Sequence, residues 1–130
     1  MEKRELQQLY HLNREIDHNK ERLAELEAAA TAVTLNVSGL PHVSAFANKT
    51  AIAAEIADLK NEIEAKTMLC IVEYNRIMRY IYSIDDSYMR QVMSLRHVNG
   101  FSWAQVAAHI GGGNTADSVR MAHNRFLQNR

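Results

Sequence analysis

The chain has 130 residues, a formal net charge of zero and 47% apolar residues. This composition excludes a disordered polyelectrolyte and fits one folded domain, or a small domain with an elongated attachment. The single cysteine excludes a disulfide framework and favours a reducing compartment, where we expect Cys70 to pack as a small apolar side chain. No apolar run approaches the length of a membrane span, so we expect a cytoplasmic protein with no membrane partner.

Charge is distributed unevenly along the chain. Residues 1–66 hold eight basic and eleven acidic residues, a balance of −3, whereas residues 67–130 hold seven arginines and four acids, a balance of +3. Arginine is well suited to bidentate contacts with phosphate or guanine. The second half of the chain therefore suits nucleic-acid contact, but so small an excess predicts weak binding by a single copy.

The first predicted element is a long amphipathic helix from about Glu2 to Val33. Its apolar positions alternate steps of three and four, which is the heptad spacing of packed helices. The stripe consists of Leu9, Leu12, Ile16, Asn19, Leu23, Leu26, Ala30 and Val33. Asn19 places a polar group in this seam, which can fix register or partner number. An ordinary helix packed on its neighbour explains the same spacing equally well.

Residues 34–48 break the pattern, and the residues from Ser38 to Pro41 indicate a turn. A second long helix is predicted from about Lys49 to Tyr82, folded back antiparallel to the first. Its stripe consists of Ile52, Ile56, Leu59, Ile63, Cys70, Ile77 and Ile84. Long helices with one apolar stripe need a partner, either each other or another copy. We therefore assign residues 1–82 to a helical hairpin that oligomerises or binds a partner.

Residues 83–130 are predicted to form three shorter helices, at about 86–99, 103–110 and 115–128. The Ser and Asp residues at 83–86 end the long helix and cap the next one. Its apolar residues are Tyr88, Val92, Met93 and Leu95. Asn99 and Gly100 close it.

The last two helices carry the most informative pattern in the chain. Ser102 and Gln105 have capping-box spacing, and the glycines at 111–113 end that helix. Asn114 or Thr115 caps the helix that follows. The inward residues of the two helices are Val106, Ala107, Ile110, Val119, Ala122 and Phe126. This is the pattern of a helix-turn-helix, whose second helix enters a DNA major groove. The predicted fold is all-α, with a long N-terminal antiparallel hairpin and a C-terminal trihelical DNA-binding unit at 83–130.

The stretch RQVMSLRHVNGFSWAQVA at residues 90–107 resembles the promoter-reading C-terminal domain of bacterial sigma factors. The whole chain looks like small sigma-factor-like proteins of phages and prophages, related in style to late-gene activators of the ArpU and RinA type. The resemblance implies a DNA-reading unit joined to an N-terminal pair of helices. Here the step from Gly111 to Val119 is two residues longer than in sigma-like units. The sigma segments that melt DNA and bind core polymerase have no counterpart, so we do not expect a complete sigma factor.

The predicted DNA-binding residues lie on or beside the last helix: Thr115, Ser118, Arg120, Met121, Asn124 and Arg125. Arginine pairs with guanine and asparagine with adenine, whereas Thr115 and Ser118 suit phosphate at the helix start. Arg125 and Arg130 can position the protein through phosphate alone. Asp117 repels phosphate and is expected to help cap the helix. The alternative is that this is an ordinary solvated helix face.

Three neighbouring residues have structural as well as functional interpretations. Trp103 is expected to pack between helices rather than to stack on a base. Arg96 is expected to contact phosphate or to pair with Asp85 or Asp86, and the sequence does not decide between these. Phe101 is expected to fill the gap between helices.

We expect no enzyme activity, no cofactor and no metal. His11 and His18 make at best half a metal site, and no metal-binding or nucleophile motif occurs. The triple glycine lacks the following Gly-Lys-Ser/Thr of a phosphate-binding loop, so it is read as a helix terminator.

The sequence therefore predicts a transcriptional regulator of phage or prophage origin that binds double-stranded DNA at or near promoters. Its long helices would supply a homo-oligomer, with a dimer favoured, or a contact with RNA polymerase. One alternative is a phage DNA-packaging protein resembling a small terminase subunit, which also joins a helix-turn-helix to oligomerising helices. The other is a protein-interaction module that binds RNA polymerase or another regulator without contacting DNA.

Overall fold

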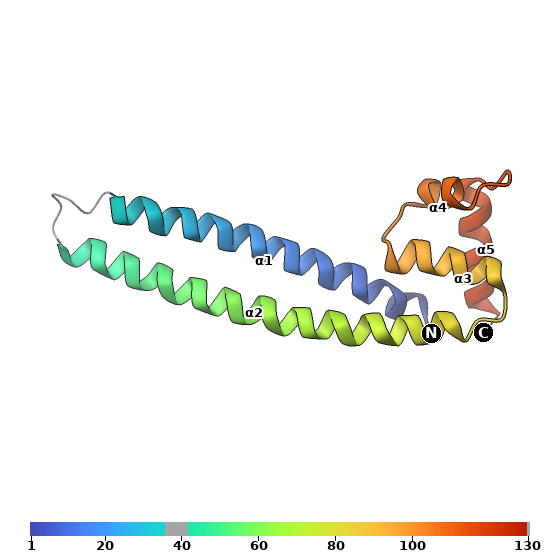
Figure 1. Ribbon diagram of the computed structural model, residues 1–130, viewed down its shortest axis with the longest axis horizontal. Helices are drawn as coiled ribbons and strands as arrows, with labels where there is room; N and C mark the ends of the chain where they lie inside the picture. The colour runs from blue at the N-terminus through green and yellow to red at the C-terminus, as the bar shows by residue number, and fades with distance from the viewer. Residues whose placement is uncertain (36–41, 130) are drawn as a thin grey trace. The chain divides into compact units, whose positions relative to one another are not determined.

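The computed structural model describes residues 1–35 and 42–129, and within them every regular element is helical. The elements are α1 (Lys3–Leu35), α2 (His42–Tyr82), α3 (Ser87–Met93), the π-helical η1 (Ser94–Val98), α4 (Trp103–Ile110) and α5 (Ala116–Gln128). Figure 1 labels the five α-helices. The all-α class and the long N-terminal helix pair are confirmed. The turn predicted at 38–41, the side chain of Val33 and Arg130 lie outside the described residues. None of the described helices combines the length and the apolar character that crossing a bilayer requires.

The chain forms two compact units whose boundaries fall inside the long helices. Residues 13–69 make one unit, here called the hairpin unit. Residues 1–12 and 70–130 make the other, here called the terminal unit. The sequence suggested a division at residue 82 instead, and the separate roles assigned to its two parts stay predictions.

In the hairpin unit, α1 and α2 run antiparallel beside each other (Figure 1). Ile16 and Leu26 are buried, whereas Asn19 in the same seam is half-buried. Ion pairs join the two helices at Arg22–Glu55 (3.2 Å), Lys66–Glu15 (2.7 Å) and Lys60–Glu27 (4.0 Å). These pairs are largely exposed, so each adds little stability, and their main effect is on the alignment of the helices.

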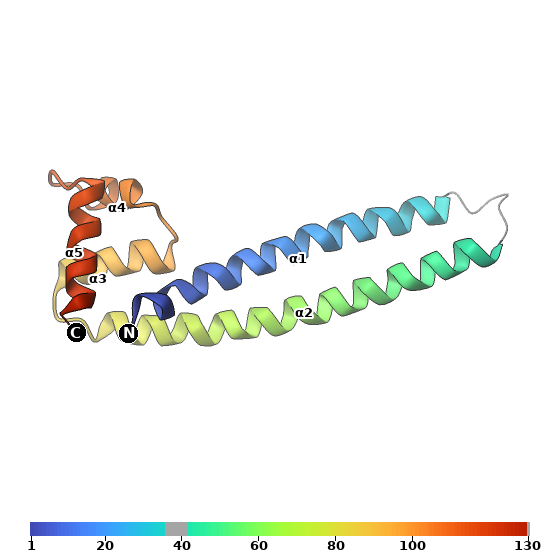
Figure 2. The ribbon, with the colours of Figure 1, turned by 180° about the vertical axis from the view of Figure 1, so that it is seen from behind.

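The core of the terminal unit draws on both ends of the sequence. Its buried apolar residues are Leu6, Leu9, Ile77, Ile81, Ile84, Met89, Val92, Met93, Val106, Ala107 and Val119. Figure 2 shows the first turns of α1 beside the last turns of α2, next to α3 and α5. An ion pair between Glu5 and Arg76 joins the two long helices here. Cys70 packs partly buried against this core, as predicted.

The predicted start of the second long helix is wrong, whereas its predicted end at Tyr82 is confirmed. The helix begins at His42 and not near Lys49, because residues 42–48 contain no glycine or proline that would stop it. It ends at Tyr82, so Ile84 lies beyond it. Ile84 is nevertheless only 1% exposed, because its N–H donates to the Ile81 carbonyl and turns its side chain into the core.

The short helices begin at the predicted caps. Asp86 accepts a hydrogen bond from Tyr88 N (3.1 Å) at the start of α3. Both hydrogen bonds of the capping box between Ser102 and Gln105 are present at the start of α4. Thr115, rather than Asn114, caps α5, through a second box with Ser118.

The turn between α4 and α5 requires glycine. Gly111, Gly112 and Gly113 have φ values of 69°, 64° and 81°, a region that residues with a Cβ rarely adopt. Asn114 Nδ2 donates to the Gly111 carbonyl (2.6 Å), and the Tyr88 hydroxyl donates to Asn114 Oδ1 (3.3 Å). The turn is therefore anchored to α3.

Replacing Leu6 by alanine should destabilise the terminal unit by about 2–5 kcal/mol, because this side chain is fully buried in its core. Trp103, the only tryptophan, lies in the same unit and reports its unfolding by fluorescence in urea. Gln8→Ala, a change at an exposed position two residues away, is the matched control and should leave the midpoint unchanged. Equal midpoints for both variants would contradict the assignment of residues 1–12 to this unit.

Candidate nucleic-acid interface

One side of α5 is buried in the terminal unit and the other side is exposed. Val119 and His123 are buried, and Ala122 and Phe126 are partly buried against the core. The exposed residues on or beside the helix are Thr115, Ser118, Arg120, Met121 and Arg125. Five of the six predicted contact residues therefore share an accessible surface, which we call the α5 face and to which Asn124 forms an edge.

The start of α5 uses two of the predicted residues for capping. Thr115 Oγ1 accepts from Ser118 N (3.1 Å), and Ser118 Oγ accepts from Thr115 N (2.9 Å). Ser118 Oγ also donates to the Thr115 carbonyl (3.0 Å). These hydroxyl groups are thus partly engaged within the helix end. The backbone N–H groups of the first helical turn remain the natural donors to a phosphate at this point.

The arginines of the α5 face differ in their surroundings. Arg120 pairs with Asp117 (3.3 Å), and both side chains are exposed. The expectation that Asp117 caps the helix is wrong, because Thr115 fills that position. Arg125 is exposed and has no ion-pair partner among the residues that the structure describes. An exposed pair is weak, so Arg120 can exchange Asp117 for phosphate at little cost.

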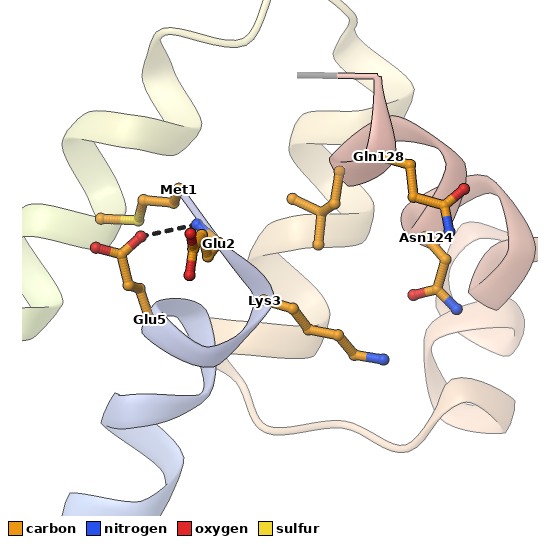
Figure 3. Close-up of a pocket in the computed structure, with 7 residues that line it drawn as sticks. Met1, Glu2, Lys3, Glu5, Asn124 and Gln128 are labelled. Carbon is orange, nitrogen blue, oxygen red and sulfur yellow. Dashed lines mark hydrogen bonds between the residues drawn. The ribbon is translucent and has the colours of Figure 1, made fainter.

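Asn124 is less exposed than predicted. It is half-buried, with its Oδ1 3.0 Å from Nδ1 of His123. Asn124 and Gln128 line a pocket of about 570 Å³. Figure 3 shows their side chains opposite Lys3 and the other lining residues at the start of α1. Helical periodicity alone places Asn124 outward, but the first turn of α1 packs beside this end of α5. The residue therefore lies between the exposed face and the pocket.

Two buried histidines hold the underside of α5. His97 Nε2 and His123 Nε2 are 2.8 Å apart, and the two side chains are 7% and 0% exposed. At this distance one imidazole donates its N–H and the other accepts it. His97 lies in the π-helical segment, where Asn99 N bonds to the Ser94 carbonyl five residues back. Sequence reasoning missed this pair, although His123 falls between Val119 and Phe126 on the inward side of its helix.

A cation–π contact continues this cluster towards α4. The Arg96 guanidinium lies 4.4 Å from the Trp103 ring centroid, and Trp103 meets His123 edge-on at 4.9 Å. Arg96 also donates to the Phe101 carbonyl (2.9 Å). Its predicted pairing with Asp85 or Asp86 is therefore wrong, because the chain at Phe101 and Trp103 turns back over it. Trp103 and Phe101 pack between helices as predicted.

The environment keeps both histidines neutral. Burial lowers the pKa of His97 to about 3, and the positive charges of Arg96 and Lys3 act in the same direction. The backbone of Leu6 opposes this shift by hydrogen bonding. Burial also lowers the pKa of His123. The pair thus acts as a neutral polar contact inside the core. No group of three or more metal-ligating side chains occurs among the described residues.

Comparison with known proteins leaves the resemblance to sigma-factor-like proteins untested. No protein-family model matches the chain, and searches of curated proteins and of solved structures found no match either. The function must therefore be argued from the α5 face itself.

Acidification should destabilise the terminal unit. The folded protein keeps His97 neutral, whereas in the unfolded chain this histidine takes up a proton near pH 6.5. The contribution of neutral His97 to the free energy of unfolding is therefore fully present above pH 6.5 and is lost as the pH falls towards about 3. Between pH 7.5 and 5.5 the loss from His97 should be about 1 kcal/mol, measured by urea unfolding followed through Trp103.

His97→Gln should reduce this pH dependence, since glutamine does not titrate. His109→Gln, at an exposed position of α4, should retain the full dependence. A wild-type urea midpoint that stays constant between pH 7.5 and 5.5 would show that His97 is not held neutral by burial in the folded protein.

Proposed function

We propose that the chain is a sequence-specific DNA-binding regulator that acts at or near promoters. In this proposal α4, the glycine turn and α5 work as a helix-turn-helix, and α5 is the recognition helix. The observation that carries the proposal is the division of α5 into a face held by the core and an exposed face with Arg120, Met121 and Arg125. Such a helix is held rigidly while its other side stays free for a partner.

The dimensions and side chains of α5 suit a major groove. Its 13 residues span about 20 Å, and a major groove about 12 Å wide admits an α-helix. Arg120 and Arg125 can contact guanine or phosphate, and Met121 can meet the methyl group of thymine. Asn124 can reach adenine only at the edge of the face, beside Lys3.

Three arginines of the terminal unit are not free to contact phosphate. Arg76 pairs with Glu5, Arg90 donates to the carbonyls of Ile84 and Asp85, and Arg96 is held by Trp103 and Phe101. These three arginines are committed to the fold. A single copy therefore offers few phosphate contacts and should bind DNA weakly. Two linked copies gain affinity through effective concentration and would favour a palindromic site, with the long helices providing the link or a contact with RNA polymerase.

A protein-interaction module without DNA contact is the second candidate. It is favoured by the large apolar side chains that α2 exposes, among them Met68, Ile71 and Val72. Apolar groups of this size gathered on a surface commonly mark a binding site for another protein. The two functions differ in what they require of the α5 face.

A selection from random duplex DNA should recover a defined motif, and Arg120→Ala with Arg125→Ala should weaken binding to it. Each lost arginine contact should reduce affinity by about 1–3 kcal/mol if it reads a base. Loss of a contact to phosphate should instead reduce the steepness of the plot of log binding constant against log salt concentration by about one. Fluorescence anisotropy across a salt series separates the two cases.

Arg4→Ala with Arg14→Ala is the matched control, because it removes the same charge from exposed positions outside α5. This control should retain nearly all of the binding. If both double variants bind the selected DNA like the wild type, the α5 face does not read DNA. If no motif emerges at low salt, the protein-interaction module becomes the better assignment.

A further inference from the structure

Helix α2 carries a second apolar face in addition to the one that packs inside the chain. Ile77 and Ile81 are buried at 0% and 3% exposure. Across the helix from them, Met68, Ile71 and Val72 are 51–61% exposed, and Tyr82 is 74% exposed. We call this surface the outer face of α2. It lies on one uninterrupted helix, so the spacing of its residues follows from α-helical geometry alone.

The outer face has heptad spacing of its own. Steps of four, three, four and seven residues lead from Glu64 through Met68, Ile71 and Asn75 to Tyr82. Residues at these steps share one side of a helix. This stripe is distinct from the stripe of Ile56, Ile63, Cys70 and Ile77 recognised from the sequence. Its exposed apolar members, Met68, Ile71 and Tyr82, give the helix a second apolar surface to bury.

Two unpaired charges flank the apolar centre symmetrically. Glu64 lies seven residues before Ile71, and Arg79 lies seven residues after Val72. Both are exposed, and neither has an ion-pair partner among the residues that the structure describes. Lys66, on the same helix, is paired within the chain. The outer face therefore carries one free acid and one free base at equal distances from its centre.

We propose that the outer face of α2 binds the same face of a second copy of this chain, antiparallel, about a two-fold axis between Ile71 and Val72. The proposal rests on the self-association included in the proposed function and specifies its surface. In such a pair Glu64 of each copy lies opposite Arg79 of the other, which gives two ion pairs around a shared apolar centre. An interface of this kind is self-complementary, as two-fold symmetry requires.

The charge pattern also selects the direction of the two helices. A parallel pair in register would place Glu64 against Glu64 and Arg79 against Arg79. Like charges that face each other repel, whereas the antiparallel arrangement places each of the four charges opposite a charge of the other sign. A two-fold pair also closes on itself, so it predicts a dimer and not a ring of many protomers.

The proposal is tested by the molar mass of the full chain, measured by light scattering after size exclusion over a concentration series. The wild type should be a dimer. Glu64→Arg should raise the dimer dissociation constant by about tenfold or more, and so should Arg79→Glu, because each creates two like-charge contacts. The double variant E64R/R79E exchanges the charges and should restore the dimer. Glu21→Arg, an exposed charge reversal on α1, is the control and should remain dimeric.

Helix content measured by circular dichroism should be the same for every variant, which separates dissociation from unfolding. A wild type that stays monomeric at high concentration overturns the proposal. A larger ring, or a dimer indifferent to both single reversals, overturns it as well. Failure of the double variant to recover excludes the antiparallel pairing of Glu64 with Arg79.

The outcome can be told apart from failure of the proposed function. Arg120→Ala with Arg125→Ala should lose DNA binding and remain a dimer. Glu64→Arg should dimerise more weakly, and its monomer should still select the same half-site, with lower affinity. If only the result expected for Glu64→Arg is not observed, the outer face is wrongly assigned while the proposed DNA binding by α5 stands.

Discussion

The terminal unit depends on burying one apolar cluster whose members come from the two ends of the sequence. Leu6 near the N-terminus and Val119 in α5 are both fully buried in it, although more than a hundred residues separate them. None of the helices α3, α4 and α5 is long enough to be stable alone, so burial of their apolar sides supplies most of their stability. The cluster decides which side of α5 is inside and, as a consequence, which side is available to a partner.

The histidine pair refines this arrangement. An apolar pair of the same size could fill the space, but His97 and His123 add a directional contact between η1 and α5. Hydrogen bonds of this kind hold two elements at one relative position, whereas apolar contacts tolerate small shifts. Trp103 and Arg96 extend the contact to α4. Contacts among η1, α4 and α5 therefore hold the buried side of α5 in place. A rigidly held helix is a suitable support for a binding surface on its exposed side.

Local sequence signals predicted much of this structure, and long-range contacts account for most of what they missed. The helix limits near 86–99, 103–110 and 115–128 and the capping residues follow from neighbours within a few positions. Asn124 was misread and the burial of Leu6 was missed, because the packing of the first turns of α1 in the terminal unit decides their environment. Arg96 was misread because its partners depend on the path of the chain after Gly100. The exposed arginines of α5 follow from periodicity, but no spacing rule shows that His97 meets His123 across 26 residues.

The two proposals are connected by the geometry of α2. With the two-fold axis between Ile71 and Val72, each Tyr82 lies between ten and eleven residues from the axis. At about 1.5 Å per residue the C-terminal ends of the paired helices are then about 32 Å apart. Half-sites on one side of B-DNA repeat at about 34–36 Å. The residues of α2 from Cys70 onward belong to the same compact unit as α5, so the proposed dimer would hold its two α5 helices at one fixed separation. If α5 binds DNA as proposed, such a dimer would supply the second set of phosphate contacts that one weakly charged copy lacks.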